Sequence, residues 1–349
     1  MPYRLNAKIR DLEPYSPITG SYPIRLDANE SFRRPTEEML EKIRNAVTEV
    51  AFNRYPDPYA EELCSAFADY YGVDKSNVTA GNGSDELISV ILGAFVMKGE
   101  SVMTLSPDFS MYRFYGYLHE SKCLEYPKKP DFSVDLEELI SSIRELNVKA
   151  LVFSNPCNPT GRGLTRDEVR KLVGSVDALV VLDEAYMDFW DQSMIREVEN
   201  YENLIILRTC SKMFGMAALR LGFAVANPSL TSAIRAVKSP YNVNTCSQKI
   251  GSIVLREKDW LQSGLAEIKA SQRKLFSMLK DLETSGHKQI LVYDSVANFT
   301  LVRVAECRRV FEDLLKAGIV VRYFEKYLRI SAGAQDENEK LIQRLKEVL

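Results

Sequence analysis

The sequence predicts an α/β protein with a mostly parallel central sheet covered by helices, followed by a smaller α+β unit. Short, almost continuously apolar runs alternate with segments of amphipathic helical spacing between about residues 100 and 226. Strands that are apolar throughout are buried on both faces, so this alternation indicates a parallel sheet between two layers of helices. After Pro240 the pattern changes to a long helical stretch and then to short strands. We therefore expect an N-terminal arm over 1–35, a large domain over 36–245 and a small C-terminal domain over 246–349.

The N-terminal arm is expected to be irregular, because it carries prolines at positions 2, 14, 17, 23 and 35. Two segments with helical apolar spacing follow it, at 36–50 and 59–71. Gly72 suits the end of the second helix, since glycine readily adopts the left-handed conformation found there.

The middle of the chain is expected to supply the central sheet. Its expected strands are 101–105, 122–126, 150–154, 178–182, 204–208 and 222–226. The expected helices include 84–97, 135–146 and 165–174. In such sheets, ligands bind at the carboxyl ends of the strands, on the loops that follow them.

The last hundred residues are expected to form the α+β unit, after a helical stretch over 245–283. The expected strands are 290–293, 299–304, 319–322 and 328–331, and the expected helices are 310–317 and 336–348.

Composition and charge favour a cytoplasmic protein with small-molecule partners. The 349 residues carry a net charge of −3 and no long basic run, which argues against nucleic acid or an anionic membrane as a partner. The N-terminus lacks the apolar core of a secretory signal, and the most apolar windows are too short to span a bilayer. The six cysteines are scattered without a C-x-x-C pair, so we expect reduced thiols and no metal site.

Two loop segments have the composition of ligand-binding turns. Residues 81–86 read GNGSDE before an apolar helix. A glycine-rich helix start can bind an anion, although this segment taken alone favours a capped helix start. Residues 154–161 read SNPCNPTG after an apolar strand. Two Asn-Pro pairs make a rigid turn that can aim an amide at a ligand, or serve only as a turn.

Two further segments place charged side chains after buried strands. Asp183 ends an apolar strand, where a carboxylate is costly unless a cation meets it; a helix cap or loop salt bridge is the alternative. Lys212 follows the next strand, where burial and nearby cations would make it an amine nucleophile; a surface lysine is the alternative. Ser211 and Arg220 are suitable phosphate partners beside it.

Together these segments supply a phosphate cradle, an amide, a carboxylate and a lysine, which is the set that pyridoxal phosphate (PLP) requires. In their order and spacing they resemble the fold-type-I PLP-dependent aminotransferases, the aspartate aminotransferase-like family. The resemblance runs from residues 26–30 (LDANE) through 54–58 (RYPDP) and the four segments to 328–330 (LRI). Within this family, the chain is most similar to the histidinol-phosphate aminotransferases.

The resemblance implies a role for particular residues in cofactor binding. Lys212 would be the catalytic residue that holds PLP as a Schiff base and later moves the proton, with Asp183 on the ring nitrogen. Asn158 and Tyr186 would bind the phenolic oxygen of PLP, and Phe109 would stack on its ring. The phosphate would be held by Ser84, Asp85, Thr209, Ser211 and Arg220, and by Tyr55 of a neighbouring subunit, which implies a homodimer with shared sites.

The resemblance also implies substrate contacts. The expected residues are Tyr15, Tyr241, Asn298, Arg322 and Arg329. Two arginines fit the phosphate of histidinol phosphate better than a carboxylate. The chain departs from the family pattern at Ser31 to Arg33, at Cys157 and in the short loop between the two arginines, and the first and last of these bear on substrate choice.

The expected reaction is PLP-dependent transamination of L-histidinol phosphate with 2-oxoglutarate and glutamate, in histidine biosynthesis. An aromatic or broad-specificity amino acid aminotransferase, or a threonine-phosphate decarboxylase of the same fold, are the alternatives. A cofactor-binding regulatory module would be expected to carry an added DNA-binding domain. A nicotinamide-dependent dehydrogenase is disfavoured because no G-x-G-x-x-G follows the first strand.

Overall fold

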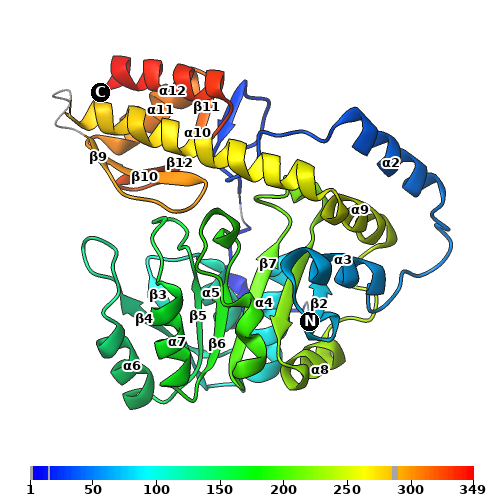
Figure 1. The fold of residues 1–349 in the computed structure, drawn as a ribbon. Helices are drawn as coiled ribbons and strands as arrows, with labels where there is room; N and C mark the ends of the chain where they lie inside the picture. The colour runs from blue at the N-terminus through cyan, green and yellow to red at the C-terminus, as the bar shows by residue number, and fades with distance from the viewer. Residues whose placement is uncertain (1–2, 15, 285–289) are drawn as a thin grey trace.

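The computed structural model describes all residues except 1–2, 15 and 285–289, and it contains two sheets, each packed against helices (Figure 1). Among the described residues, the larger sheet has the strand order β2-β8-β7-β6-β5-β3-β4. Its strands are β2 (Val78–Gly81), β3 (Ser101–Ser106), β4 (Lys122–Pro127), β5 (Val148–Ser154), β6 (Leu179–Asp183), β7 (Leu204–Thr209) and β8 (Gly222–Ala226). Strands β3 to β7 are parallel, and β8 is antiparallel to both of its neighbours. The predicted mostly parallel α/β sheet is confirmed.

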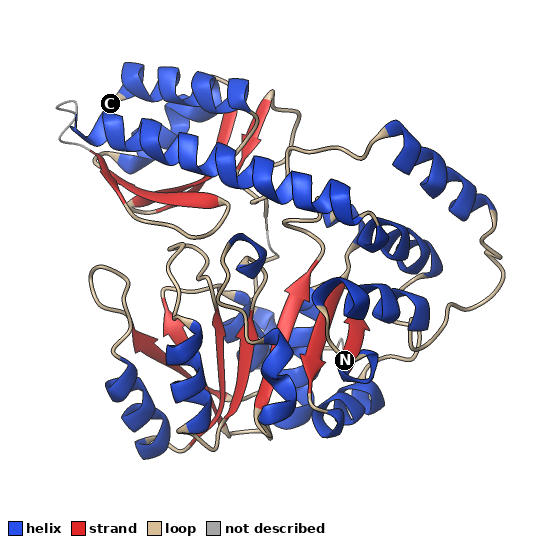
Figure 2. Cartoon of the chain, viewed as in Figure 1, coloured by secondary structure: helices blue, strands red, loops and turns tan. Residues whose placement is uncertain are grey.

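Helices cover both faces of this sheet because successive side chains of a strand point to opposite faces (Figure 2). In β5, Leu151 and Phe153 belong to one buried core, whereas Ala150 and Val152 belong to the other. The first core includes residues of α3 (Glu61–Tyr71), α6 (Leu136–Glu145) and α7 (Arg166–Gly174). The second includes residues of α4 (Ser84–Phe95), α5 (Met111–Leu118) and α8 (Pro228–Val237).

The smaller sheet has the order β1-β11-β12-β10-β9 in the described chain. Its strands are β1 (Ile24–Leu26), β9 (Ile290–Val292), β10 (Phe299–Val304), β11 (Ile319–Phe324) and β12 (Tyr327–Ser331). It packs in a third core with α11 (Cys307–Lys316) and α12 (Gln335–Val348). The four strands and two helices predicted for this part of the chain are confirmed.

The expectation of an irregular N-terminal arm is wrong at β1, which lies parallel to β11. Ile24 and Leu26 are buried in the third core while Arg25 between them is exposed. A strand of three residues is too short to show a periodicity, so only its pairing partner identifies it. The arm also contains a short helix, α1 (Ala7–Arg10).

The long helical stretch after residue 245 is two helices, α9 (Thr245–Arg256) and α10 (Lys258–Thr284). Helix α10 contributes to two cores: Leu261 and Ile268 lie in the first, and Leu275 and Leu279 lie in the third. The helix therefore joins the two sheets, and the predicted domain boundaries at 35/36 and 245/246 stay predictions. The remaining elements are α2 (Glu37–Thr48) and the 3-10 helices Lys75–Asn77, Met187–Phe189, Ile195–Asn200 and Ala217–Leu219.

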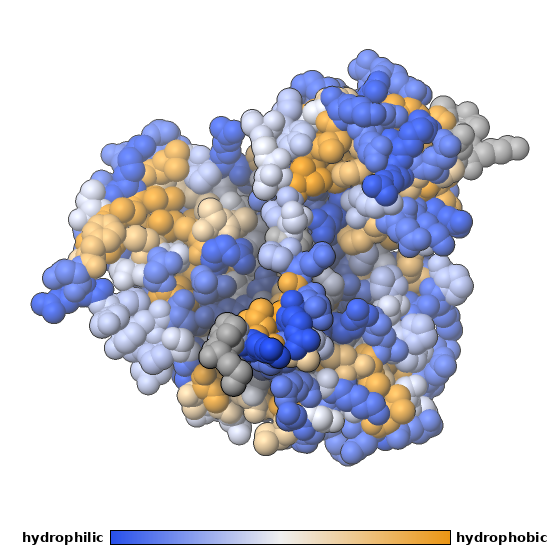
Figure 3. All heavy atoms as spheres, turned by 180° about the vertical axis from the view of Figure 1, so that it is seen from behind, coloured by the Kyte–Doolittle hydropathy of each residue, from blue (hydrophilic) through white to orange (hydrophobic). Residues whose placement is uncertain are grey.

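The face of the molecule opposite to that in Figure 1 carries hydrophilic residues interspersed with hydrophobic ones (Figure 3). Within the described residues, no helix combines the length and the apolar character needed to cross a membrane.

Candidate active site

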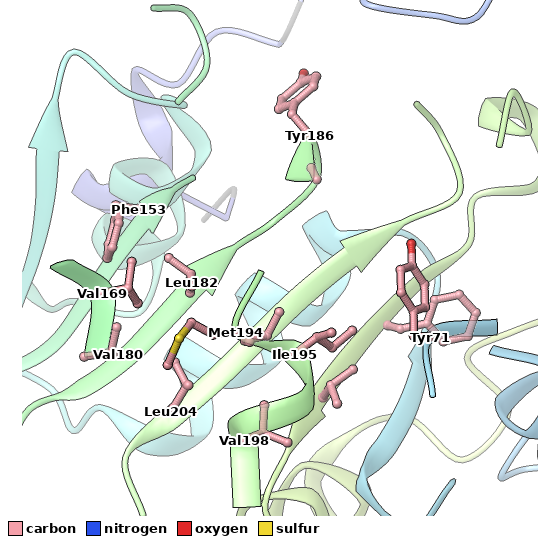
Figure 4. Packing of buried hydrophobic residues seen from close by; sticks show 14 of the residues in the cluster. Tyr71, Phe153, Val169, Val180, Leu182, Tyr186, Met194, Ile195, Val198 and Leu204 are labelled. Atoms are coloured by element: carbon pink, nitrogen blue, oxygen red, sulfur yellow. The ribbon is translucent and has the colours of Figure 1, made fainter. Parts of the chain in front are cut away.

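The candidate site lies where the parallel strands β5, β6 and β7 end. Ser154, Asp183 and Thr209 are the last residues of these strands, and parallel strands bring their carboxyl ends to one edge of a sheet. In Figure 4, Tyr186 stands beyond the end of β6, past the packed side chains of Leu182 and Val180 below it. The polar groups at this edge of the sheet therefore adjoin closely packed apolar side chains.

Asp183 is a buried carboxylate at the end of β6. Its Oδ2 accepts a hydrogen bond of 2.7 Å from the Tyr112 hydroxyl, and its Oδ1 accepts one of 3.0 Å from the Ala185 backbone N–H. In the described part of the chain, no lysine or arginine forms an ion pair with it. Burial raises the pKa of this carboxyl to about 7, although the bond from Tyr112 lowers it. A protonated ring nitrogen would supply the cation that this position lacks.

Lys212 extends from the loop after β7 towards Tyr186. Its Nζ donates a hydrogen bond of 2.8 Å to the backbone oxygen of Ala28 and lies 5.7 Å from the centre of the Tyr186 ring. The amine is therefore held between the N-terminal segment and the end of β6. Tyr186 itself is buried, and its hydroxyl accepts a hydrogen bond of 2.9 Å from Asn29 Nδ2.

Arg220 and two hydroxyls form a polar cluster beside the start of α4. Nη1 of Arg220 donates to Ser211 Oγ at 3.2 Å, and the Ser211 backbone N–H donates to Thr209 Oγ1 at 3.1 Å. Nη2 of Arg220 lies 3.9 Å from Oδ2 of Asp85 in the first turn of α4. Guanidinium, hydroxyls and a helix N-terminus together make a site suited to a phosphate.

Two glycines allow this close approach of the chain. A Cβ on Gly83 would lie 2.7 Å from Nη2 of Arg220, and one on Gly222 would lie 2.4 Å from the backbone nitrogen of Ser84. Gly83 also has a φ of +83°, which a residue with a side chain rarely adopts. The residues present therefore fit the phosphate and the ring of PLP.

Arg329 in β12 brings the smaller sheet to the site. It donates hydrogen bonds to Asn158 Oδ1 and, at 2.5 Å, to the backbone oxygen of Asp27. Asn158 is fixed from the other side, because its backbone N–H donates to Ser154 Oγ at 2.9 Å. Since Oδ1 of Asn158 faces the arginine, its amide nitrogen is the atom left to donate to a ligand.

Arg322 is the cross-strand partner of Arg329 in the antiparallel pair β11–β12. Directly opposite residues point to the same face of a sheet, and the guanidinium carbon of each lies 5.9 Å from the centre of the Phe324 ring. The structure therefore places both guanidinium groups near the same aromatic ring, that of Phe324.

The other predicted substrate and stacking residues fall into two groups. Asn298 is buried, its Nδ2 donates to the Asn29 backbone oxygen at 3.2 Å, and its Oδ1 has no hydrogen-bond partner in the described chain. The Phe109 ring is half-buried and contacts the Tyr112 ring at 5.5 Å between centres. Both residues therefore lie against side chains of the site.

Tyr55 and Tyr241 lie on the surface instead. They are 81% and 46% exposed, and their rings stack on each other at 4.5 Å. The expected role of Tyr55 in a neighbouring subunit stays a prediction. Tyr241 was expected near the substrate, but within the described chain its ring contact is with Tyr55. Tyr15 lies outside the described residues.

Sequence reasoning missed two polar residues that contact the site. Tyr112 follows Phe109 by three residues, one helical turn, and that spacing could have shown that its hydroxyl reaches the same sheet edge. Asn29 lies in the LDANE segment that supported the family resemblance, but nothing local to that segment shows that it contacts Tyr186.

Comparison with known proteins agrees with these features. The model of a family described as aminotransferase class I and II matches residues 22–345. The histidinol-phosphate aminotransferase of Clostridium kluyveri is 41% identical over 341 residues, which are 96% of each chain. That of Clostridium novyi is 40% identical over 343 residues, covering 97% of this chain and 95% of the relative.

Among solved structures, the histidinol-phosphate aminotransferase of Sinorhizobium meliloti in complex with pyridoxal-5'-phosphate superposes with a TM-score of 0.88. It is 24% identical, and the match covers 99% of this chain and 97% of that one, which shows a common fold. The match of the family model and the identity to full-length relatives decide the assignment. The chain belongs to the class I and II aminotransferases, a family of PLP-dependent enzymes.

Proposed function

We propose that this chain transfers the amino group of L-histidinol phosphate to 2-oxoglutarate, with PLP as cofactor. The observation that carries the proposal is the cross-strand pair Arg322 and Arg329, of which Arg329 donates a hydrogen bond to Asn158. Two guanidinium groups suit a phosphate dianion, and the full-length relatives are histidinol-phosphate aminotransferases.

PLP supplies an aldehyde that reacts with amines and a protonated ring that accepts electron density from the substrate carbon. We propose that Asp183 pairs with the ring nitrogen, because it is a buried carboxylate that forms no ion pair with any residue the structure describes. Arg220, Ser211, Thr209 and the N–H groups at the start of α4 (Ser84 and Asp85) would bind the phosphate. Phe109 would cover the ring.

Lys212 would hold the cofactor covalently and, when its amine is released, take the proton from the substrate carbon. Its position suits both roles, since its Nζ lies near Tyr186 and is oriented by the Ala28 oxygen. Tyr186 and the amide nitrogen of Asn158 would donate hydrogen bonds to the phenolic oxygen of PLP. Asn298 would use its Oδ1, which accepts no hydrogen bond from the described residues, as an acceptor in the same space.

We further propose a cytoplasmic homodimer with shared active sites. Phe52, Tyr55 and Tyr59 form an exposed aromatic segment, and a hydroxyl on such a segment can enter the site of a second subunit. Tyr241 stacks on Tyr55 and would belong to the same surface.

The first experiment is the absorbance spectrum of the purified protein before and after L-histidinol phosphate is added. A visible band near roughly 410–430 nm that moves to about 330 nm would support both the cofactor and the substrate. A band that moves only with glutamate or aromatic amino acids would favour the broad-specificity alternative. A band that moves with threonine phosphate, with release of CO2, would favour the decarboxylase. If no band forms even with added PLP, the proposal is wrong.

A further inference from the structure

Asn29 is completely buried between the two sheets, in a conformation that few residues adopt. Its φ is +55°, in the left-handed region that asparagine tolerates better than most side chains. Its side chain bridges Ser331 of β12 and Tyr186 after β6. One side chain therefore connects the N-terminal segment with both sheets, next to Lys212.

The hydrogen bonds of Ser331 fix the orientation of the Asn29 amide. The hydroxyl oxygen of Ser331 accepts from the Asn29 backbone N–H at 2.9 Å, and the hydroxyl proton is donated to Asn29 Oδ1 at 2.9 Å. With Oδ1 placed at Ser331, the amide nitrogen must face Tyr186. An amide nitrogen only donates, so the Tyr186 oxygen can only accept from it.

The Tyr186 proton is consequently directed away from Asn29. A phenol has one proton, and the bond of 2.9 Å from Asn29 occupies an acceptor position of the oxygen. The ring is held by an edge-to-face contact with Phe299, with 5.1 Å between the ring centres, so the hydroxyl cannot turn to another side of the site. The remaining freedom is the rotation of the proton, and the amide protons repel it.

We propose that Asn29 is a positioning residue that makes Tyr186 a hydrogen-bond donor to the phenolic oxygen of PLP, with Ser331 holding the amide in the required orientation. This inference rests on the proposed use of PLP at this site. A donor to that oxygen stabilises its negative charge and weakens its hold on the neighbouring proton of the Lys212 nitrogen. The loaded enzyme then loses this proton at a lower pH than it would without the donor.

The test is the isosteric variant Asn29→Asp, loaded with PLP and titrated by visible absorbance. Aspartate tolerates the same backbone conformation but presents an acceptor to Tyr186. The Tyr186 hydroxyl would then donate its proton to the aspartate and not to PLP. We expect the pH midpoint of the absorbance change to rise by about one unit, since a hydrogen bond to a charged group contributes roughly that much. Ser331→Ala, which adds no charge, is expected to shift the midpoint in the same direction by less.

The double variant with Tyr186→Phe separates this role from the effect of an added charge. If Asn29 acts through Tyr186, then Asn29→Asp in a Tyr186→Phe background adds only the shift that its negative charge causes, which is smaller than its shift in the wild-type background. Asn338→Asp is the matched control, because Asn338 of α12 is also buried and donates its amide to a hydroxyl, that of Ser271 in α10. It is expected to lower stability without moving the midpoint.

An unchanged midpoint in both Asn29→Asp and Ser331→Ala overturns the inference, as does a full shift that persists in the Tyr186→Phe background. If Asn29→Asp does not fold, the result for Ser331→Ala decides by itself. A wild-type protein that gives no visible band with PLP overturns the proposed function as well, so the two failures are distinguishable.

Discussion

The hydroxyl of Tyr112 donates a hydrogen bond of 2.7 Å to the carboxylate of Asp183, and both side chains are buried beneath the candidate cofactor site. This bond and the one from Ala185 stabilise the carboxylate, but burial outweighs them and raises its pKa to about 7. A cation bound next to Asp183 would therefore stabilise its ionised form.

The raised pKa of Asp183 should make the stability of the cofactor-free protein depend on pH. Asp183 binds its proton more tightly in the folded state than in the unfolded chain. Its contribution to the free energy of unfolding is therefore present below about pH 4 and lost as the pH rises through about 7. We expect the stability of Asp183→Asn relative to wild type to increase by a few kcal/mol across that range, as measured by urea unfolding. A difference that does not depend on pH would contradict the assignment.

Lys212→Arg should abolish the visible band and lower transamination by a factor of about 10² to 10⁴ or more. Arginine keeps the positive charge and can still reach the Ala28 oxygen, but its guanidinium stays protonated and cannot react with an aldehyde. Lys274→Arg, in an exposed ion pair with Glu339, serves as the control and should keep both signals. Retention of the band in Lys212→Arg would show that another amine holds the cofactor.

Binding of L-histidinol phosphate should depend on both Arg322 and Arg329, whereas binding of glutamate should depend less on Arg322. A dianion can use both guanidinium groups, whereas a carboxylate needs one. We expect Arg322→Met to raise KM for L-histidinol phosphate about tenfold or more, and KM for glutamate by less, because each charge-assisted bond contributes about 1.5–3 kcal/mol. Steady-state kinetics with both substrates measure this. Arg303→Met, on an exposed position of the same sheet, is the control, and equal effects on both KM values would argue against the phosphate assignment.

A buried ion pair beneath the site should be needed for stability. Arg208 contacts Glu184 at 2.7 Å and Asp188 at 2.9 Å, and the side chains of Arg208 and Glu184 are at most 3% exposed. Arg208→Gln should lower the free energy of unfolding by about 3–5 kcal/mol, because it leaves a buried carboxylate unpaired. The solvent-accessible pair of Arg170 with Glu197 provides the comparison, and Arg170→Gln should lower the free energy of unfolding far less. Urea unfolding of both variants measures the two changes. Similar losses of stability would contradict the prediction that the buried ion pair contributes more.

Shared active sites predict complementation between two inactive variants. Lys212→Ala lacks the amine, and a Tyr55→Ala variant would lack the hydroxyl that its partner needs. A hybrid dimer of the two contains one site with both groups intact, so mixing and reassociating the subunits should restore activity that neither variant has. If Tyr55 served its own subunit, both sites of the hybrid would remain defective and the mixture would stay as inactive as its components.

Much of the large sheet could be predicted from the sequence, because its central strands are buried on both faces. Strand β2 and helices α5 and α8 were missed. Strand β2 has only four residues, and α5 is rich in tyrosine and phenylalanine, which favour strands as readily as helices. Tyr241 shows the limit for site residues, since its family position did not reveal that its ring stacks on Tyr55 at the surface.

The sequence by itself determined the fold class, the loops that carry the site and the family, because strand burial and turn chemistry are local properties. Only the tertiary structure decided which groups meet. Asn29 reaches Tyr186 across 157 positions, and it reaches Ser331 across 302, so neither contact leaves a local pattern. The hydrogen bond of Tyr112 to Asp183 and the cross-strand pairing of Arg322 with Arg329 likewise depend on strand order and register, which are set by the packing of the whole chain.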